Sequence, residues 1–152
     1  MTVRRYHALR ARQAPDHDVF VFAAHPGDIL EFAQIERVGR ADNGQLKGFQ
    51  RHQIATHIRD IRDYLARDDA LLPNAVIVAF IDGVQIEDLG CGRLEIVVDD
   101  QNGPPGFVVD GQQRLTAMSG LGKPDFQVFV SAVVCKNYDE LRQQFVLINS
   151  TR

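Results

Sequence analysis

The sequence predicts an α+β domain, with an α/β arrangement as the alternative, because strand-like apolar segments and amphipathic helical segments both recur along it. The chain has 152 residues, which suits one domain rather than two. Hydrophobic residues make up 45% and charged residues 24%, so the composition is that of a folded globular protein and not of a disordered one.

The first predicted elements are a strand and an ambiguous segment. Residues 18–24 (DVFVFAA) are rich in β-branched and aromatic residues, which favours a strand, and the sequence HPGD at 25–28 ends it. The apolar positions of residues 29–38 fit a helix about as well as a strand. Residues 39–48 predict a loop with a turn at Asn43-Gly44.

The clearest predicted helix covers residues 50–67, and Leu72-Pro73-Asn74 marks its end. Four aliphatic side chains form one stripe along it at the spacing i, i+4, i+7 and i+11, namely Ile54, Ile58, Ile61 and Leu65. Residues 75–81 (AVIVAFI) are almost continuously apolar, which predicts a strand buried on both faces.

The second half of the chain predicts three strands and two helices. We interpret residues 93–99 and 107–110 as the two strands of a hairpin, joined by the turn-rich sequence DQNGPPG. Residues 111–121 predict a short helix packed on the sheet, because apolar residues recur at every third position. A strand over 126–134 and a helix over 139–149 complete the predicted elements.

Charge, hydropathy and cysteine content exclude several classes of protein. The net charge of −3 rules out a globally basic surface, so contact with nucleic acid would need a local patch. No apolar run is long enough to span a bilayer, and the basic N-terminus lacks the apolar core of a secretory signal. Cys91 and Cys135 match no metal or redox spacing, which predicts two reduced thiols in a cytoplasmic protein. Since the chain stops directly after its last predicted helix, we expect it to be the front part of a longer protein.

The strongest candidate for a functional site is Asp110-Gly111-Gln112-Gln113-Arg114, which directly follows an apolar strand and opens a predicted helix. Free backbone N–H groups and the helix dipole favour an anion there, and Gly111 allows a sharp turn close to a ligand. Arg114 would form bidentate hydrogen bonds with a phosphate or carboxylate, and Asp110 would hold a metal or a water or orient Arg114. The alternative is an ordinary helix start, with Asp110 as N-cap and Arg114 in a surface ion pair.

This motif, preceded by two valines and followed by Leu-Thr-Ala, resembles the DGQHR/DGQQR signature of the ParB/sulfiredoxin-like superfamily. That superfamily includes partition proteins, sulfiredoxins, DUF262-type (GmrS-like) nucleases and the DndB-type DGQHR-domain proteins of DNA-modification clusters. The last group is the most similar, through Gln50-Arg51-His52, residues 57–65, Leu72-Pro73-Asn74 and the terminal INSTR. Within it, the sequence is similar to the ParB-like component of a 7-deazaguanine DNA-modification system. The resemblance covers residues 18–152 and leaves residues 1–17 as an N-terminal extension.

The resemblance implies a small mixed sheet with flanking helices that binds ATP or another nucleoside triphosphate together with Mg²⁺. The four residues from Gly111 to Arg114 would face the phosphates, and Asp110 would face the metal or the attacking water. Asp110, Gln113 and Arg114 are accordingly the expected catalytic residues. Asn149 corresponds to a family position near the nucleotide, with helix capping as the alternative.

Two departures from the superfamily narrow the expected chemistry. Gln113 stands where the family has a histidine, and because glutamine does not transfer protons near neutral pH as histidine does, we expect it to position groups rather than act as a base. The sulfiredoxin cysteine is absent from the motif, so sulfinic-acid repair is not expected.

The expected function is that of an ATP-hydrolysing, Mg²⁺-dependent component of a DNA-modification or genome-defence system, acting with a partner base-modifying enzyme. One alternative is a DNA-binding transcriptional regulator of such a cluster, with contacts from the basic helix residues Arg51, His52, Arg59 and Arg62. The ordinary interpretation of that helix face is a solvated surface with interleaved acidic residues. A second alternative is the nucleotide-sensing part of a DUF262-type nuclease, which would not cut DNA by itself, and a third is a scaffold with neither activity. A homodimer is a reasonable expectation.

Overall fold

The computed structural model describes residues 2–35 and 48–150, which form an α+β fold. The four helices of this part of the chain are α1 (Pro26–Phe32), α2 (Gly48–Leu65), α3 (Gln112–Met118) and α4 (Tyr138–Ser150). The strands are β1 (Val3–Ala14), β2 (His17–Ala24), β3 (Ala33–Ile35), β4 (Val76–Phe80), β5 (Val84–Gly90), β6 (Arg93–Asp99), β7 (Gly106–Asp110) and β8 (Val128–Val134).

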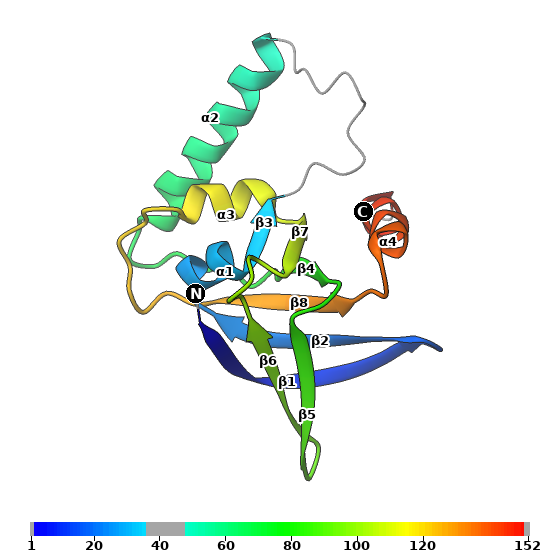
Figure 1. Ribbon diagram of the computed structural model, residues 1–152. Coiled ribbons are helices and arrows are strands. Elements are labelled where there is room, and N and C mark those ends of the chain that lie inside the picture. Colours follow the sequence, from blue (N-terminus) through cyan, green and yellow to red (C-terminus); the bar gives the residue numbers. More distant parts are fainter. Residues whose placement is uncertain (1, 36–47, 151–152) are drawn as a thin grey trace.

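The strands form one mixed sheet that curls into a half-barrel (Figure 1). Their order is β3-β7-β4-β8-β2-β1-β6-β5. The pairs β3–β7 and β4–β8 are parallel and the other neighbours are antiparallel. The long strand β1 connects the two halves of the sheet, because residues 9–14 pair with β2 and residues 3–8 pair with β6.

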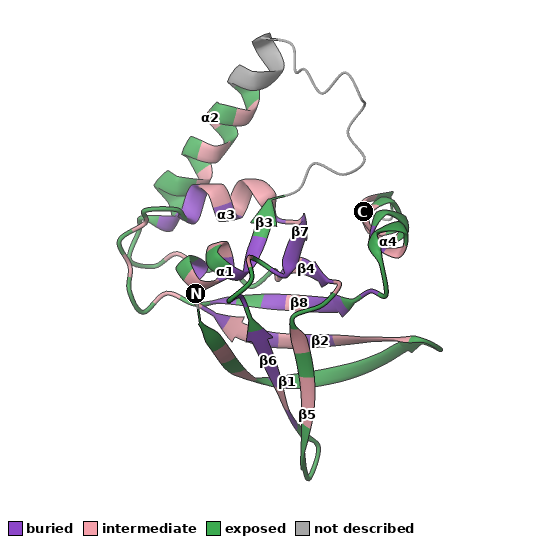
Figure 2. Cartoon of the chain, in the orientation of Figure 1, coloured by how far each residue is buried: buried purple, intermediate pink, exposed green. Residues whose placement is uncertain are grey.

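Apolar side chains cover both faces of the sheet. The larger cluster lies between the sheet and the helices α1 and α3, and it includes Ile29, Phe32, Phe80, Ile96 and Leu115. The smaller cluster lies under α4, where Leu141 packs with Phe107, Val109 and Val133. Figure 2 shows the resulting buried band along β4, β7 and β8. The strand β4 is thus buried on both faces, as its continuous apolar sequence predicts.

The helix α2 projects away from the sheet and is mostly exposed along its described length (Figures 1 and 2). Its last residue, Leu65, is fully buried in the larger cluster. One turn earlier, the Arg62 guanidinium donates hydrogen bonds to the backbone carbonyls of Ala117 at 3.1 Å and Thr116 at 3.2 Å. The end of α3 therefore fixes the C-terminal half of α2.

Most sequence-predicted elements are confirmed, with shifted ends. The strands expected at 18–24, 75–81 and 126–134 are β2, β4 and β8, and the helices expected at 50–67, 111–121 and 139–149 are α2, α3 and α4. The ambiguous segment 29–38 contains both kinds of structure, since α1 ends at Phe32 and β3 begins at Ala33. The loop expected at 39–48, with its turn at Asn43-Gly44, lies outside the described residues up to position 47.

The predicted hairpin of residues 93–110 is wrong. Strand β6 pairs with β1 and β5, whereas β7 pairs with β3 and β4 in the other half of the sheet. The connection between them contains Pro104-Pro105 and the buried carboxylate of Asp100, which turns inward to Arg4. This connection carries the chain across the half-barrel instead of turning it back on itself.

Two strands were not predicted from the sequence. Residues 1–17, expected to be an N-terminal extension, contain all of β1. Strand β5 is the real hairpin partner of β6, through the tight turn Gly90-Cys91-Gly92. Both strands carry many charged side chains, which hides the apolar alternation that marks a half-buried strand. Among the described residues, no helix combines the length and apolar character needed to cross a membrane.

Candidate functional site

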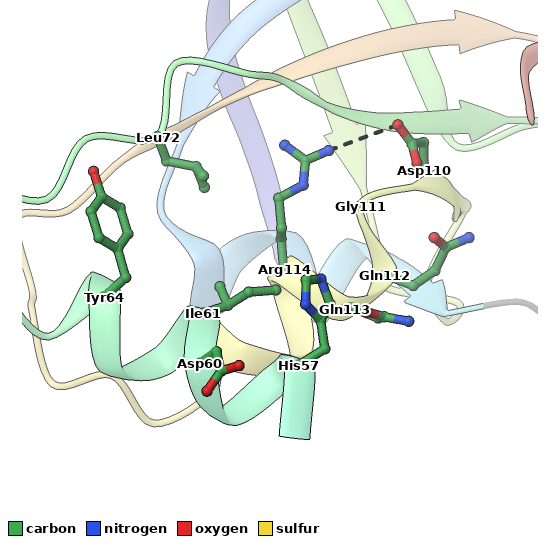
Figure 3. A pocket seen from close by; sticks show the side chains of 10 residues that line it. All are labelled: His57, Asp60, Ile61, Tyr64, Leu72, Asp110, Gly111, Gln112, Gln113 and Arg114. Atoms are coloured by element: carbon green, nitrogen blue, oxygen red, sulfur yellow. Dashed lines mark ion pairs between the residues drawn. The ribbon is translucent and has the colours of Figure 1, made fainter. Parts of the chain in front are cut away.

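The motif predicted from the sequence lines a pocket of about 640 Å³ between α2 and the start of α3 (Figure 3). All five motif residues, from Asp110 to Arg114, contribute to its wall. The opposite wall is one face of α2, with the side chains of His57, Asp60, Ile61 and Tyr64 at the spacing i, i+3, i+4 and i+7. Leu72, in the connection between α2 and β4, completes the lining.

Gly111 makes the turn from β7 into α3 possible. Its backbone has φ 97° and ψ 18°, a left-handed conformation that glycine adopts readily. A Cβ atom at this position would lie only 2.7 Å from Cγ1 of Val76. The expected sharp turn is therefore confirmed, and a close approach to β4 adds a second reason for glycine.

The start of α3 differs from an ordinary capped helix. Gly111 is the N-cap residue and no side chain caps the helix, so the interpretation of Asp110 as the N-cap is wrong. The helix has only seven residues, which limits the contribution of its dipole to anion binding. The side chains that surround the pocket must therefore carry most of any attraction for a ligand.

Arg114 is held at the pocket by three interactions. Its Nη1 donates to the carbonyl of Asn74 at 3.0 Å, and its Nη2 donates to the carbonyl of Ala75 at 3.3 Å. The same Nη2 lies 3.8 Å from Oδ2 of Asp110 (Figure 3). With side-chain exposures of 20% and 14%, this ion pair is less screened than one on the open surface. Arg114 thus joins α3 to the segment that leads into β4.

Gln112 and Asn149 meet at the end of β7. Nε2 of Gln112 donates to the carbonyls of Val108 at 3.2 Å and Val109 at 3.0 Å. Nδ2 of Asn149, from α4, donates to the same Val109 carbonyl at 3.2 Å and to Phe145 at 2.7 Å. Asn149 therefore lies beside the motif, but the described lining of the pocket does not include it.

Three pocket residues on α2 were not predicted from the sequence. His57, Asp60 and Tyr64 flank the aliphatic stripe of the helix, where they resemble ordinary surface residues. The only available signal was their shared helical face, and it becomes informative only once α3 is known to pack beside it. Gln113, which was predicted, lines the pocket together with them.

The predicted nucleic-acid residues have different surroundings. Arg59 is exposed on α2, whereas Arg62 is bonded to the end of α3. The side chains of Arg51 and His52 lie outside the described part of the structure. The acidic residues Asp60 and Asp63 are interleaved with the arginines on the exposed part of the helix.

The carboxylates of the pocket lining could hold a magnesium ion that takes its other ligands from a phosphate group and from water. Within residues 2–35 and 48–150, no three His, Cys, Asp or Glu side chains form a metal-binding group. Mg²⁺, however, is commonly bound through one or two carboxylates, with phosphates and waters as its other ligands. Asp110 provides one such carboxylate, and Asp60 lies across the same pocket.

No family model, curated protein or solved structure matches this chain.

Proposed function

We propose that this chain binds ATP or another nucleoside triphosphate with Mg²⁺ in the pocket between α2 and α3. The observation that carries the proposal is that all five motif residues and a polar face of α2 surround one pocket. Its volume of about 640 Å³ lies in the range of small-molecule and cofactor sites. The polar end of the pocket combines a guanidinium, two side-chain amides and a carboxylate, which suit phosphate groups and a phosphate-bound metal.

Each motif residue has a proposed part in binding. Arg114 would donate N–H groups to phosphate oxygens, because its guanidinium has five N–H donors and the two backbone carbonyls engage only part of them. Gln113 would donate from its amide, and Gly111 would allow the ligand to approach the backbone. Asp110 would hold Mg²⁺, which supplies positive charge next to the phosphates.

The charges around the pocket make the metal important for binding. Asp60 and Asp110 are the carboxylates of the lining and Arg114 is its permanent cation. A triphosphate entering without a cation would meet at least as much negative as positive charge. Nucleotide binding should therefore depend on Mg²⁺ and should be lost when the metal is chelated.

We further propose that the bound nucleotide is hydrolysed, with Asp110 orienting the attacking water and Arg114 stabilising charge on the phosphates. Gln113 would position groups without transferring protons. We also propose a role in a DNA-modification or genome-defence system, with DNA and a base-modifying enzyme as partners. This part of the proposal rests on the resemblance of the DGQQR motif and its flanks. Binding and hydrolysis of the nucleotide would control when that enzyme acts on DNA.

The test is isothermal titration of the purified protein with ATP, CTP and GTP in the presence of Mg²⁺, together with a phosphate-release assay. We expect Arg114→Ala to weaken binding at least about tenfold, because a charge-assisted hydrogen bond contributes about 1.5–3 kcal/mol. Arg142→Ala, a surface change on α4, is the matched control and should bind as the wild type does.

Two further measurements keep this test decisive. Since Arg114 also bonds the segment before β4, circular dichroism must show that Arg114→Ala is folded, and Gln113→Ala provides a second, gentler change. Failure of folded wild type to bind any of the three nucleotides with Mg²⁺ would overturn the proposal. A steep salt-dependent affinity for DNA in the same preparation would then favour the regulator alternative.

A further inference from the structure

We propose that Tyr64 is the platform on which the nucleotide base stacks, so that the pocket takes a ligand with an aromatic ring and not a polyphosphate alone. This inference rests on the proposed function, since it places the base relative to phosphates that lie against the motif. It adds to that function a contact for the base that the motif itself does not supply.

The pocket has two chemically different ends. Ile61, Tyr64 and Leu72 form an apolar and aromatic end, whereas the motif from Asp110 to Arg114 forms the polar end. Figure 3 shows Tyr64 and Leu72 on one side of Arg114, with Asp110 and Gln112 on the other. A ligand that fills such a pocket needs a flat apolar part joined to a polar, anionic part. A nucleoside triphosphate has this construction.

The Tyr64 ring is held in place before any ligand binds. Its hydroxyl donates to the carbonyl of Leu71 at 3.0 Å and accepts from the backbone N–H of the same residue at 2.9 Å. The residue nevertheless remains 41% exposed. Because these two bonds fix the ring, stacking a base on it costs little additional side-chain entropy.

The same two hydrogen bonds decide what Tyr64 can recognise. Its hydroxyl already donates its proton and accepts a bond, so it is not the group that reads the edge of a base. One face of the ring remains for stacking, because Arg67, whose guanidinium covers the other face, does not belong to the pocket lining. Stacking tolerates every base because every base has a π-face. The guanidinium of Arg67 lies over the ring, with Cζ 5.9 Å from its centroid, and is itself bonded to Asp69. Tyr64 should accordingly add affinity while discriminating weakly among bases.

The experiment compares two ligands, Mg²⁺–ATP and inorganic triphosphate with Mg²⁺, by calorimetry on the full chain. The measured quantity is the ratio of their dissociation constants in each variant, since differences in ligand charge and ribose contacts then cancel between variants. Stacking of one base should make the ATP preference about 5- to 150-fold larger in wild type than in Tyr64→Leu.

Two variants separate stacking from the anchoring of the chain. Tyr64→Phe removes both bonds to Leu71 but keeps the ring, so it should retain most of the ATP preference. Tyr138→Leu removes an exposed tyrosine from α4, outside the pocket lining, and should leave the preference unchanged.

Each outcome has a distinct meaning. An unchanged ATP preference in Tyr64→Leu would overturn the inference, as would an equal loss in Tyr64→Phe, which would identify Tyr64 as an anchor only. If wild type and Tyr64→Leu both bind triphosphate as tightly as ATP, the inference is overturned while the phosphate site stays intact. If wild type binds neither ligand, the proposed function itself fails.

Discussion

Gly111 combines two constraints that the sequence reveals only in part. A strand that enters a helix through Asp-Gly indicates a sharp turn, and the left-handed backbone at this residue confirms it. The approach of Val76 could not be predicted, because it depends on the pairing of β4 with β7. Gly111 therefore fixes both the entry into α3 and the distance of the motif from β4.

We predict that Gly111→Ala is more destabilising than Gly120→Ala. Both glycines have positive φ values, 97° and 74°, and each alanine would carry backbone strain of about 1–2 kcal/mol. Only at Gly111 would the new Cβ also meet Val76, at 2.7 Å, whereas nothing lies within 4 Å at Gly120. Urea unfolding of the two variants measures the difference, and equal losses of stability would contradict the close contact.

The arginines show why residue type alone does not reveal a role. From the sequence, Arg62 is a candidate contact to nucleic acid, with a solvated helix face as the ordinary interpretation, and Arg114 is a candidate phosphate ligand. Both donate to backbone carbonyls, Arg62 at the end of α3 and Arg114 at the segment before β4. Such contacts join residues that are 39 to 55 positions apart, and no local pattern in the sequence encodes them.

The secondary structure elements around the site were largely predictable, because their apolar periodicity is strong. The stripe of α2 and the continuous apolar run of β4 each led to the correct element. Strands β1 and β5 were not predicted, because their apolar periodicity is weak. Their solvent-facing and inward positions both carry polar residues, such as Arg4 and Asp88. The α2 wall of the pocket remained hidden because it exists only through the packing of α2 on α3.

The helix α4 holds the far side of β7 and covers a buried thiol. Leu141 is fully buried there, and Phe145 and Ile148 pack against the same cluster. Cys135 lies in that cluster, and burial, with Glu140 nearby, raises the pKa of its thiol to about 11. Cys135 should therefore be unreactive at neutral pH for as long as α4 stays docked.

We predict that Leu141→Ala exposes Cys135. In a Cys91→Ser background, which removes the exposed thiol, the wild-type helix should leave Cys135 slow to react with a thiol reagent such as DTNB. Leu141→Ala should speed the reaction and lower the free energy of unfolding by about 2–5 kcal/mol. Leu147→Ala, at a position 55% exposed, is the control and should change neither quantity appreciably. Equal labelling rates in all variants would mean that α4 does not protect the thiol.

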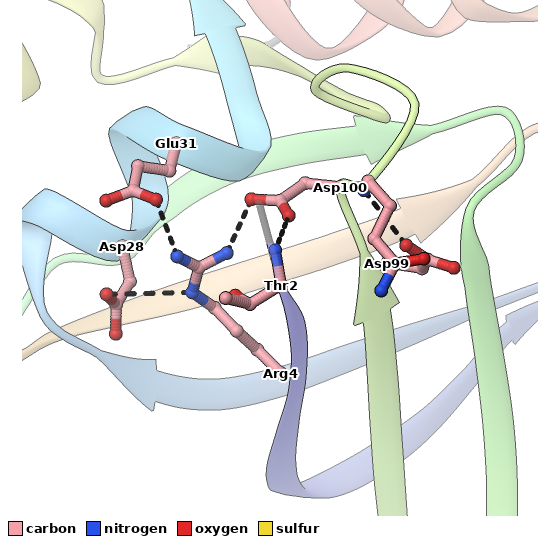
Figure 4. Close-up of polar contacts among 7 residues, drawn as sticks. Thr2, Arg4, Asp28, Glu31, Asp99 and Asp100 are labelled. Atoms are coloured by element: carbon pink, nitrogen blue, oxygen red, sulfur yellow. Dashed lines mark hydrogen bonds and ion pairs between the residues drawn. The ribbon is translucent and has the colours of Figure 1, made fainter.

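Across the whole molecule, Arg4 ties the first strand to two distant parts of the chain (Figure 4). Its guanidinium bonds Asp100 in the β6–β7 connection at 2.5 Å and Glu31 in α1 at 2.7 Å, and it lies 3.6 Å from Asp28. Asp100 is the buried charged residue of the described structure, at 3% exposure. Burial alone would raise the pKa of Asp100, but the hydrogen bonds from the Thr2 backbone N–H and from Arg4 outweigh it and lower that pKa.

This network predicts how stability depends on pH. Because the folded-state pKa of Asp100 is lowered, its stabilisation is fully present above its unfolded pKa, about 3.9, and is lost as the pH falls through the folded value. Asp100→Asn should lower stability at pH 7 by about 1.5–3 kcal/mol and should unfold with a shallower pH dependence below about pH 4.

Urea unfolding between pH 2 and pH 7 measures this effect. Some acid dependence should remain in Asp100→Asn, because the hydrogen bond from His17 also lowers the pKa of Glu140. Asp69→Asn, which breaks an exposed pair with Arg67, is the control and should follow the wild-type curve. A constant difference between wild type and Asp100→Asn at every pH would contradict the assigned charge state.

The position of β1 between β2 and β6 has a consequence for how the protein is made. Val3 is synthesised well before its partner Asp99, which follows 96 positions later in the chain. Until then, the β6-facing edge of β1 presents unpaired backbone groups, which is the kind of edge through which nascent chains aggregate. The charged residues that make this strand hard to recognise in the sequence, Arg4 and Arg5 among them, would keep the unpaired edge soluble. The same side chains would protect the chain during synthesis and then stabilise the half-barrel once β6 has paired with β1.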